Sequence, residues 1–235
     1  MDDNNLTLSS LCKIDWEKVY RLPWHLDIDE PASEKHEAGY WNERAKTMYD
    51  DEDYCAPRVK AFLEFVDIPA GASVIDIASG IGVLTLPLIE KGCRVTAVDI
   101  SDYSLDVLKK NCVKNIENLR IVNEYFREAA ENLEPCDYVL NFYSLGLVCM
   151  DRGGNTDLAD LLIKMNNLAK KKVVITMPEN EENDIAEVFK KSYYWILYGV
   201  LLSLGIVPKL EFKWVEGLGM MGIIHWEPIR IINKK

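Results

Sequence analysis

The sequence predicts an α/β domain in which a mostly parallel sheet is flanked by helices. From residue 73 onward, short runs rich in β-branched residues alternate with helical patterns, as parallel βαβ units require. A glycine-bearing turn follows the first of these runs, and acidic residues stand at the ends of the first two. A chain of 235 residues is long enough to bury a core around such a sheet.

The first expected strand is Ser73-Val-Ile-Asp-Ile-Ala78, which is apolar except for its serine and its acidic residue. A helix is expected from residue 81 to residue 91, because Gly92 is suited to the left-handed position that ends many helices. Six further segments have strand composition, so we expect seven strands in all. They are 73–78, 94–99, 119–123, 137–142, 172–176, 209–214 and 222–226.

Three later positions are expected to begin or end elements. Ser101 can cap the helix after the second strand, because its hydroxyl can accept a hydrogen bond from a free backbone N–H of the first turn. Thr156 is expected to cap a helix whose apolar residues share one face. Pro178 is expected to close the strand 172–176, and residues 181–204 are expected to be helical.

The segment before the first strand has a different character. Residues 34–48 and 54–66 have helical patterns and precede the alternating part of the chain. We therefore expect residues 1–66 to form an N-terminal helical extension that covers one end of the sheet. Residues 67–235 would form the α/β domain.

The charge of the chain disfavours nucleic acid as a partner. The net charge is −11, and residues 1–53 contain 14 Asp and Glu against 6 Lys and Arg. An acidic surface repels a polyphosphate backbone.

The longest uncharged run, residues 192–208, is shorter than the roughly 20 apolar residues of a spanning helix and contains two glycines. No transmembrane segment is therefore expected.

The cysteines and histidines indicate neither a metal site nor a disulfide framework. None of the six cysteines forms a C-x-x-C pair, and the three histidines lie far apart in the sequence. Reduced, packed thiols are typical of cytoplasmic proteins. The acidic start of the chain also lacks the apolar stretch of a signal peptide, so a cytoplasmic location is expected.

The most informative segment is the turn after the first strand, Asp76-Ile-Ala78-Ser79-Gly80-Ile-Gly82. Glycine allows a ligand to approach the backbone closely, and open α/β sheets bind ligands at the carboxyl ends of their strands. Asp99 ends the second strand, where a carboxylate can accept both hydroxyls of a ribose. The sequence therefore predicts a binding site for a nucleoside-containing cofactor at this edge.

This segment resembles the first motif of the class I S-adenosylmethionine-dependent methyltransferases, the small-molecule members of the methyltransferase 11 and 25 type. The family motif is an acidic residue, any residue, then Gly-x-Gly-x-Gly, and here Ala78 replaces the first glycine. The resemblance implies a Rossmann-like, seven-stranded, mostly parallel sheet. It also implies that the turn, including Ser79, receives the methionine part, that Asp99 holds the ribose and that Ile100 lies against the adenine.

The resemblance extends to other parts of the chain. Glu124 and Tyr125 stand where the family often has an acidic residue near the adenine amino group. Asn141 lies in a segment similar to the fourth strand of the family, which faces the methyl-transfer centre. Tyr40 begins a segment similar to one that precedes the core in some small-molecule members, and it could reach the cofactor.

The implied function is transfer of the methyl group of S-adenosylmethionine to a small, partly hydrophobic acceptor, with S-adenosylhomocysteine as product. A non-catalytic regulator or scaffold that binds the cofactor is the main alternative. An NAD(P)-dependent oxidoreductase is less favoured, because Thr85 occupies the place of the third glycine of the dinucleotide motif. A methyltransferase that acts on amino groups of nucleic acids is also less favoured. That class has two prolines where this chain has Asn141-Phe-Tyr-Ser.

The sequence does not identify a catalytic residue. A general base is needed only if the acceptor must lose a proton, and His36 and Tyr143 are the candidates near the expected acceptor site. The acceptor is expected to contact the N-terminal extension, residues 143–150 and the aromatic segment 193–195. The oligomeric state stays open, a homodimer included.

Overall fold

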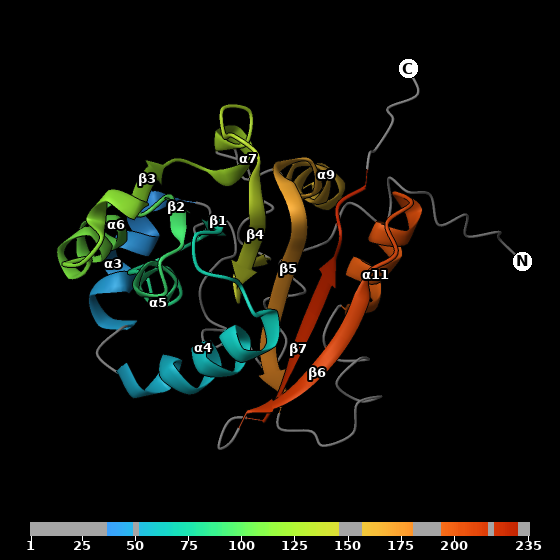
Figure 1. The fold of residues 1–235 in the computed structure, drawn as a ribbon, viewed down its shortest axis with the longest axis horizontal. Coiled ribbons are helices and arrows are strands. Elements are labelled where there is room, and N and C mark those ends of the chain that lie inside the picture. Colours follow the sequence, from blue (N-terminus) through green and yellow to red (C-terminus); the bar gives the residue numbers. More distant parts are fainter. Residues whose placement is uncertain (1–36, 49–51, 146–156, 181–193, 216–218, 230–235) are drawn as a thin grey trace, which may run out of the picture.

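A seven-stranded sheet forms the centre of the molecule (Figure 1). This computed structural model describes residues 37–48, 52–145, 157–180, 194–215 and 219–229. The strand order is β3-β2-β1-β4-β5-β7-β6, in which β1 to β5 are parallel and β7 is antiparallel to both of its neighbours. The strands are β1 (Ser73–Ile77), β2 (Arg94–Asp99), β3 (Leu119–Asn123), β4 (Cys136–Phe142), β5 (Ala169–Asn180), β6 (Lys209–Val215) and β7 (Gly219–Trp226).

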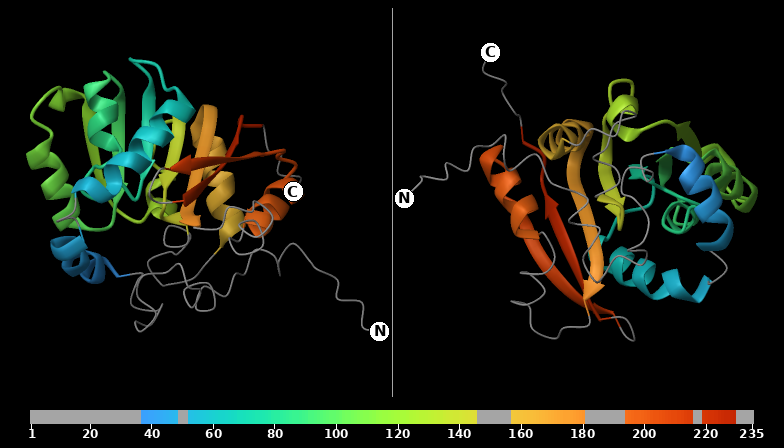
Figure 2. Two further views of the ribbon diagram at one scale, coloured as in Figure 1. Left: turned by 90° about the horizontal axis from the view of Figure 1, so that it is seen from below. Right: turned by 180° about the vertical axis from the view of Figure 1, so that it is seen from behind.

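Helices cover both faces of the sheet (Figure 2). Strand side chains alternate between the faces, so Val74 packs with the helices of one layer and Ile75 with those of the other. The first layer contains α4 and α5, and the second contains α7, α9 and α11. The helices are α3 (Ala38–Met48), α4 (Glu52–Val66), α5 (Thr85–Glu90), α6 (Asp102–Asn111), α7 (Phe126–Ala129), α9 (Leu158–Leu168) and α11 (Tyr194–Ser203), with a 3₁₀ turn at Ile116–Asn118.

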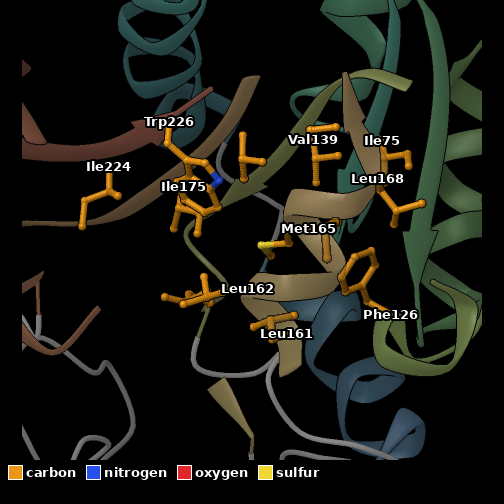
Figure 3. Packing of buried hydrophobic residues seen from close by; sticks show 14 of the residues in the cluster. Ile75, Phe126, Val139, Leu161, Leu162, Met165, Leu168, Ile175, Ile224 and Trp226 are labelled. Atoms are coloured by element: carbon orange, nitrogen blue, oxygen red, sulfur yellow. The ribbon is translucent and has the colours of Figure 1, made fainter. Parts of the chain in front are cut away.

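The largest apolar cluster lies between the sheet and α9. Figure 3 shows Met165 and Leu162 of α9 packed near Ile175 of β5, with Trp226 of β7 at one side of the cluster. These four side chains are at most 2% exposed. The expected apolar face of this helix is therefore confirmed as core.

No described helix is long and apolar enough to cross a membrane.

Three boundary expectations need correction. Helix α5 begins at Thr85 and not at residue 81, because Gly82 has φ +93°, which a right-handed helix does not accommodate. Asp157 caps α9 by accepting a hydrogen bond from the N–H of Asp160 at 2.9 Å, whereas Thr156 lies outside the described residues. Strand β5 continues past Pro178, at a place where its pairing with β7 changes register.

Helix α3 precedes the sheet in sequence and lies beside α6 (Figure 1). The contact depends on Asn42, whose side chain accepts a hydrogen bond from the Ser101 hydroxyl at 2.7 Å and donates one to Asp102 at 2.6 Å. Ser101 caps α6 as expected, by accepting from the N–H of Ser104 at 3.0 Å. The contact therefore fixes α3 next to the carboxyl end of β2.

Candidate functional site

The carboxyl ends of β1, β2 and β4 bring the expected site residues to one edge of the sheet. Ile77 of β1 is paired with Val98 of β2 on one side and with Asn141 of β4 on the other. Asp76 precedes Ile77 in β1, and Asp99 is the last residue of β2. The parallel register thus places an acidic side chain at two neighbouring strand ends and an amide at the third.

The glycine turn has an unusual backbone. Ala78, Gly80 and Gly82 have φ values of +57°, +53° and +93°, all in the left-handed region. Glycine enters this region without steric strain, whereas an alanine there costs roughly 1 kcal/mol. This conformation explains why the family has glycine at the position of Ala78. It also turns the chain sharply between β1 and α5.

Asp99 is linked to the glycine turn by its side chain. Its carboxylate accepts a hydrogen bond from the N–H of Gly80 at 2.8 Å and one from the N–H of Ser101 at 2.8 Å. Burial raises the pKa of Asp99, and these backbone hydrogen bonds oppose the rise. Each carboxylate oxygen has a further lone pair, so the bound, oriented carboxylate can still accept hydrogen bonds from a diol.

Asp76 is a second carboxyl group behind the turn. It is 1% exposed and accepts a hydrogen bond from the Thr85 hydroxyl at 2.6 Å. Burial raises its pKa to about 7, the Thr85 hydrogen bond opposes this rise, and the charge of Asp99 adds to it. The site therefore contains a carboxyl group that titrates near neutral pH.

Two buried polar atoms at this edge have no hydrogen-bond partner among the residues that the structure describes. Asn141 donates through Nδ2 to the carbonyl of Ile77 at 3.3 Å and to the Ser144 hydroxyl at 2.9 Å. Its Oδ1 atom and the Oγ atom of Ser79 are both buried and unsatisfied. Because buried polar groups nearly always form hydrogen bonds, these two atoms are suited to bonding a ligand.

The end of β3 is attached to the end of β2. The N–H of Glu124 donates to the carbonyl of Asp99 at 3.1 Å, and the Glu124 carboxylate accepts from the N–H of Tyr125 at 3.3 Å. Tyr125 is the N-cap residue of α7. Asn123 donates through Nδ2 to the carbonyls of Asp99 and Ile100 at 3.1 and 3.0 Å. Glu124 and Ile100 thus adjoin Asp99.

Sequence reasoning did not identify Asn42, Thr85 or Asn123 as parts of this site. Each acts through a hydrogen bond to a residue distant in sequence or beyond a turn, which no local pattern reveals. The available signal was limited to an amide at the end of the third strand and a hydroxyl after the glycine turn.

The remaining candidates are Tyr40, Tyr143 and His36. Tyr40 is on α3, with its ring edge-on to that of Trp41 at a centroid distance of 5.1 Å. Tyr143 follows β4 with φ +62°, and its N–H donates to the Thr176 hydroxyl at 3.1 Å. The guanidinium of the buried Arg58 lies 5.9 Å from the centre of the Tyr143 ring. His36 lies outside the described residues.

Among the described residues, no group of three or more His, Cys, Asp or Glu side chains could hold a metal ion. Cys93, Cys112 and Cys136 are buried free thiols, in agreement with the expectation of packed cysteines. His225 is 6% exposed and pairs with Glu211 at 3.1 Å, so it is a satisfied histidine of the β6–β7 pair.

A match to a known family covers this edge of the sheet. Residues 74–172 match the model of a family described as a methyltransferase domain. This segment runs from β1 into β5 and contains the glycine turn, Asp99 and Asn141. The seven-stranded sheet has the fold of the class I S-adenosylmethionine-dependent methyltransferases, which confirms the expected fold, and the matched segment agrees with the expected family.

Individual proteins are similar to the chain at low identity. A crystal structure of an S-adenosylmethionine-dependent methyltransferase from Aquifex aeolicus has 15% identity and a TM-score of 0.59, and it covers 80% of this chain and 98% of its own. Magnesium protoporphyrin IX methyltransferase from Synechocystis PCC 6803, with SAH bound, has 13% identity and a TM-score of 0.53 and covers 91% and 93%. At these identities the likeness shows the fold.

One curated relative matches by sequence over a short segment. It is named "Probable ribosomal RNA small subunit methyltransferase A", from Methanosphaera stadtmanae, and it is 31% identical over 68 residues, which is 28% of this chain. The chain covers 25% of the length of that protein. The family match and the ligand-bound neighbour agree with the expected cofactor, S-adenosylmethionine.

Proposed function

We propose that this protein binds S-adenosylmethionine across the carboxyl ends of β1, β2 and β4 and transfers its methyl group to a small, partly hydrophobic acceptor. The observation that carries the proposal is the Asp99 carboxylate, held by the N–H groups of Gly80 and Ser101 beside a left-handed glycine turn. This arrangement offers an oriented acceptor for a ribose diol next to the glycine turn.

The residues of this edge fit the parts of the cofactor. The turn at Ala78, Ser79, Gly80 and Gly82 would receive the methionine part, with the unsatisfied Ser79 hydroxyl and Asn141 oxygen available to its polar groups. Ile100 would lie against the adenine, with Glu124 and Tyr125 near its amino group. Tyr40 on α3 would approach the cofactor from outside the sheet. Asp76 would support the turn through Thr85.

Methyl transfer requires little chemistry from the protein. When bound, S-adenosylmethionine supplies a methyl group that its sulfonium already activates. The protein has to hold the nucleophile in line with this group, and such positioning contributes roughly 7–11 kcal/mol in favourable cases. Tyr143, whose backbone is fixed by Thr176 at the end of β4, stands where it can position the acceptor.

The acceptor that we propose is a small molecule with apolar surface and not RNA. Phe142 and Tyr143 are half-buried and form an edge-on aromatic contact at the carboxyl end of β4, which favours an acceptor with apolar surface. The net charge of −11 disfavours RNA, the substrate named for the curated relative. The buried free thiols support a cytoplasmic location. Residues 1–66 would act as an extension at the acceptor side, supported by the α3–α6 contact.

The test is a calorimetric titration of the wild-type protein and of Asp99→Ala with S-adenosylmethionine and with NAD. We expect binding of S-adenosylmethionine alone, weakened at least tenfold in Asp99→Ala, because roughly two charge-assisted hydrogen bonds are lost. Binding of NAD, or equal S-adenosylmethionine affinity in both proteins, would overturn the assignment. A screen of small aromatic acceptors and of ribosomal RNA for formation of S-adenosylhomocysteine then separates an enzyme from a non-catalytic binding protein.

A further inference from the structure

Asp76 and Asp99 place two carboxyl groups at neighbouring strand ends. Asp76 is buried in β1 against the Thr85 hydroxyl, and Asp99 ends β2 in contact with the glycine turn. The two groups interact electrostatically, since the charge of Asp99 acts on Asp76. The turn that we assign to the cofactor connects them in space.

The surroundings of Asp76 leave its charge without a described counter-ion. Strand β4 and helix α5 contribute the uncharged side chains of Asn141 and Thr85. The charged residues of these two elements, Asp137 and Glu90, stand at their far ends from the turn. On α4, the guanidinium of Arg58 lies over the ring of Tyr143, after β4.

The cofactor and its product differ in charge at the reacting atom. S-adenosylmethionine carries a sulfonium, whereas S-adenosylhomocysteine has a neutral thioether at the same place. An opposite charge within about 10 Å, at an effective dielectric constant near 20, changes a binding constant by roughly tenfold. A pair of carboxylates can therefore distinguish the two molecules without touching the sulfur.

We propose that Asp76 and Asp99 act as a charge-selective pair that makes the site prefer the sulfonium cofactor to its neutral product. The pair would favour release of product after transfer, and Asp76 would supply the part of the preference that depends on pH. This inference rests on the proposed function.

The direction of the pH dependence follows from the burial of Asp76. Its pKa is raised to about 7, so Asp76 is ionised above neutral pH and protonated below it. The preference for S-adenosylmethionine is therefore strong at pH 8 and weak at pH 5.5. Because a bound cation favours the ionised form, binding of S-adenosylmethionine near pH 7 should release more protons than binding of S-adenosylhomocysteine.

The experiment measures dissociation constants of both molecules by calorimetry at pH 5.5 and pH 8.0 for wild-type protein and Asp76→Asn. Asparagine keeps the shape and can still accept the Thr85 hydrogen bond. At pH 8.0 we expect Asp76→Asn to bind S-adenosylmethionine roughly tenfold more weakly and S-adenosylhomocysteine within twofold of wild type. At pH 5.5 the two proteins should bind S-adenosylmethionine equally within twofold. Comparing the proteins at each pH cancels the titration of the ligand's own amino group.

The control is Asp67→Asn, which removes one charge from a side chain that is 95% exposed, before the amino end of β1. It should match wild type for both molecules at both pH values. A second variant, Thr85→Val, removes the hydrogen bond that lowers the pKa of Asp76. The preference for S-adenosylmethionine should then be lost at a higher pH than in the wild-type protein. If Asp76→Asn does not fold, this variant and the proton release of the wild-type protein test the proposal instead.

The outcomes separate the two proposals. Equal weakening of both molecules in Asp76→Asn, or a preference that is the same at pH 5.5 and 8.0, would overturn the charge-selective pair and leave the proposed function intact. If the wild-type protein binds no S-adenosylmethionine at both pH 5.5 and pH 8.0, the proposed function itself is overturned.

Discussion

Gly82 is required for two separate reasons, and they can be measured apart. Its φ of +93° strains any residue with a side chain, and a Cβ atom there would lie 2.3 Å from Cδ1 of Leu108 on α6. The second reason is a packing constraint between the glycine turn and the helix that follows β2. A motif usually explained by close approach of a ligand thus also allows close approach of a helix.

We predict that Gly82→Ala lowers the free energy of unfolding by about 2–3 kcal/mol, from backbone strain and overpacking together. Gly71→Ala is the matched control, because Gly71 has φ +80° with no atom within 4 Å of the added Cβ. It should cost about 1 kcal/mol, from strain alone. Urea unfolding of both variants gives the difference. Equal losses would show that Leu108 moves aside without penalty.

At the amino ends of the strands, the side chain of Asp137 links three parallel strands. Asp137 at the start of β4 accepts hydrogen bonds from the N–H and the hydroxyl of Ser73 in β1, each at 3.0 Å. Lys171 of β5 pairs with it at 3.1 Å. The hydrogen bond from the Ser73 N–H, followed by that from Lys171, lowers the pKa of Asp137 to about 2.

Since the pKa of Asp137 is lower in the folded protein than its ordinary value of 3.8, ionised Asp137 stabilises the fold above pH 4. This contribution should be lost as the pH falls from about 4 to about 2. We predict that Asp137→Asn lowers the free energy of unfolding at pH 7 by about 1–2 kcal/mol, after allowance for partial solvent exposure.

Unfolding of both proteins in denaturant at pH 7, 4 and 2.5 tests this. The difference between them should shrink with falling pH, and Asp67→Asn, on an exposed carboxylate, should match wild type throughout. A difference that stays constant would mean that the loss comes from geometry and not from charge.

Across the molecule, short-range patterns were sufficient for the strands but not for the site. Apolar runs located the parallel strands, because a buried parallel strand has to be apolar throughout. The alternation of polar and apolar residues located β6, as in a strand with one solvated face. The resemblance to the methyltransferases supplied the edge at which Asp99 stands. The turn after β1 is longer than the sequence predicts, because a single residue such as Ala78 gives no sign of its left-handed backbone. The contacts of Asn42 and Asn123 depend on tertiary packing, which local pattern does not encode.

The proposed cofactor site joins four strand ends, so binding there should be linked to unfolding of the whole domain. Asp99 contacts the turn after β1 by its side chain, and its carbonyl accepts from Asn123 at the end of β3 and from Glu124 directly after it. A ligand that binds the native state alone at 100 times its dissociation constant stabilises it by about 2.7 kcal/mol. For a chain of this size the corresponding rise in Tm is roughly 5–10 °C.

Thermal unfolding with S-adenosylmethionine, S-adenosylhomocysteine or NAD measures this linkage. We expect a rise of Tm with the first two, scaling with the logarithm of their concentration, and none with NAD. Asp99→Ala should lose most of the rise at the same ligand concentration, whereas Asp67→Asn should keep it, because its carboxylate lies outside this edge. A rise that persists in Asp99→Ala would mean that the ligand binds elsewhere on the molecule. Its stabilising effect would then not depend on the edge at β1 and β2.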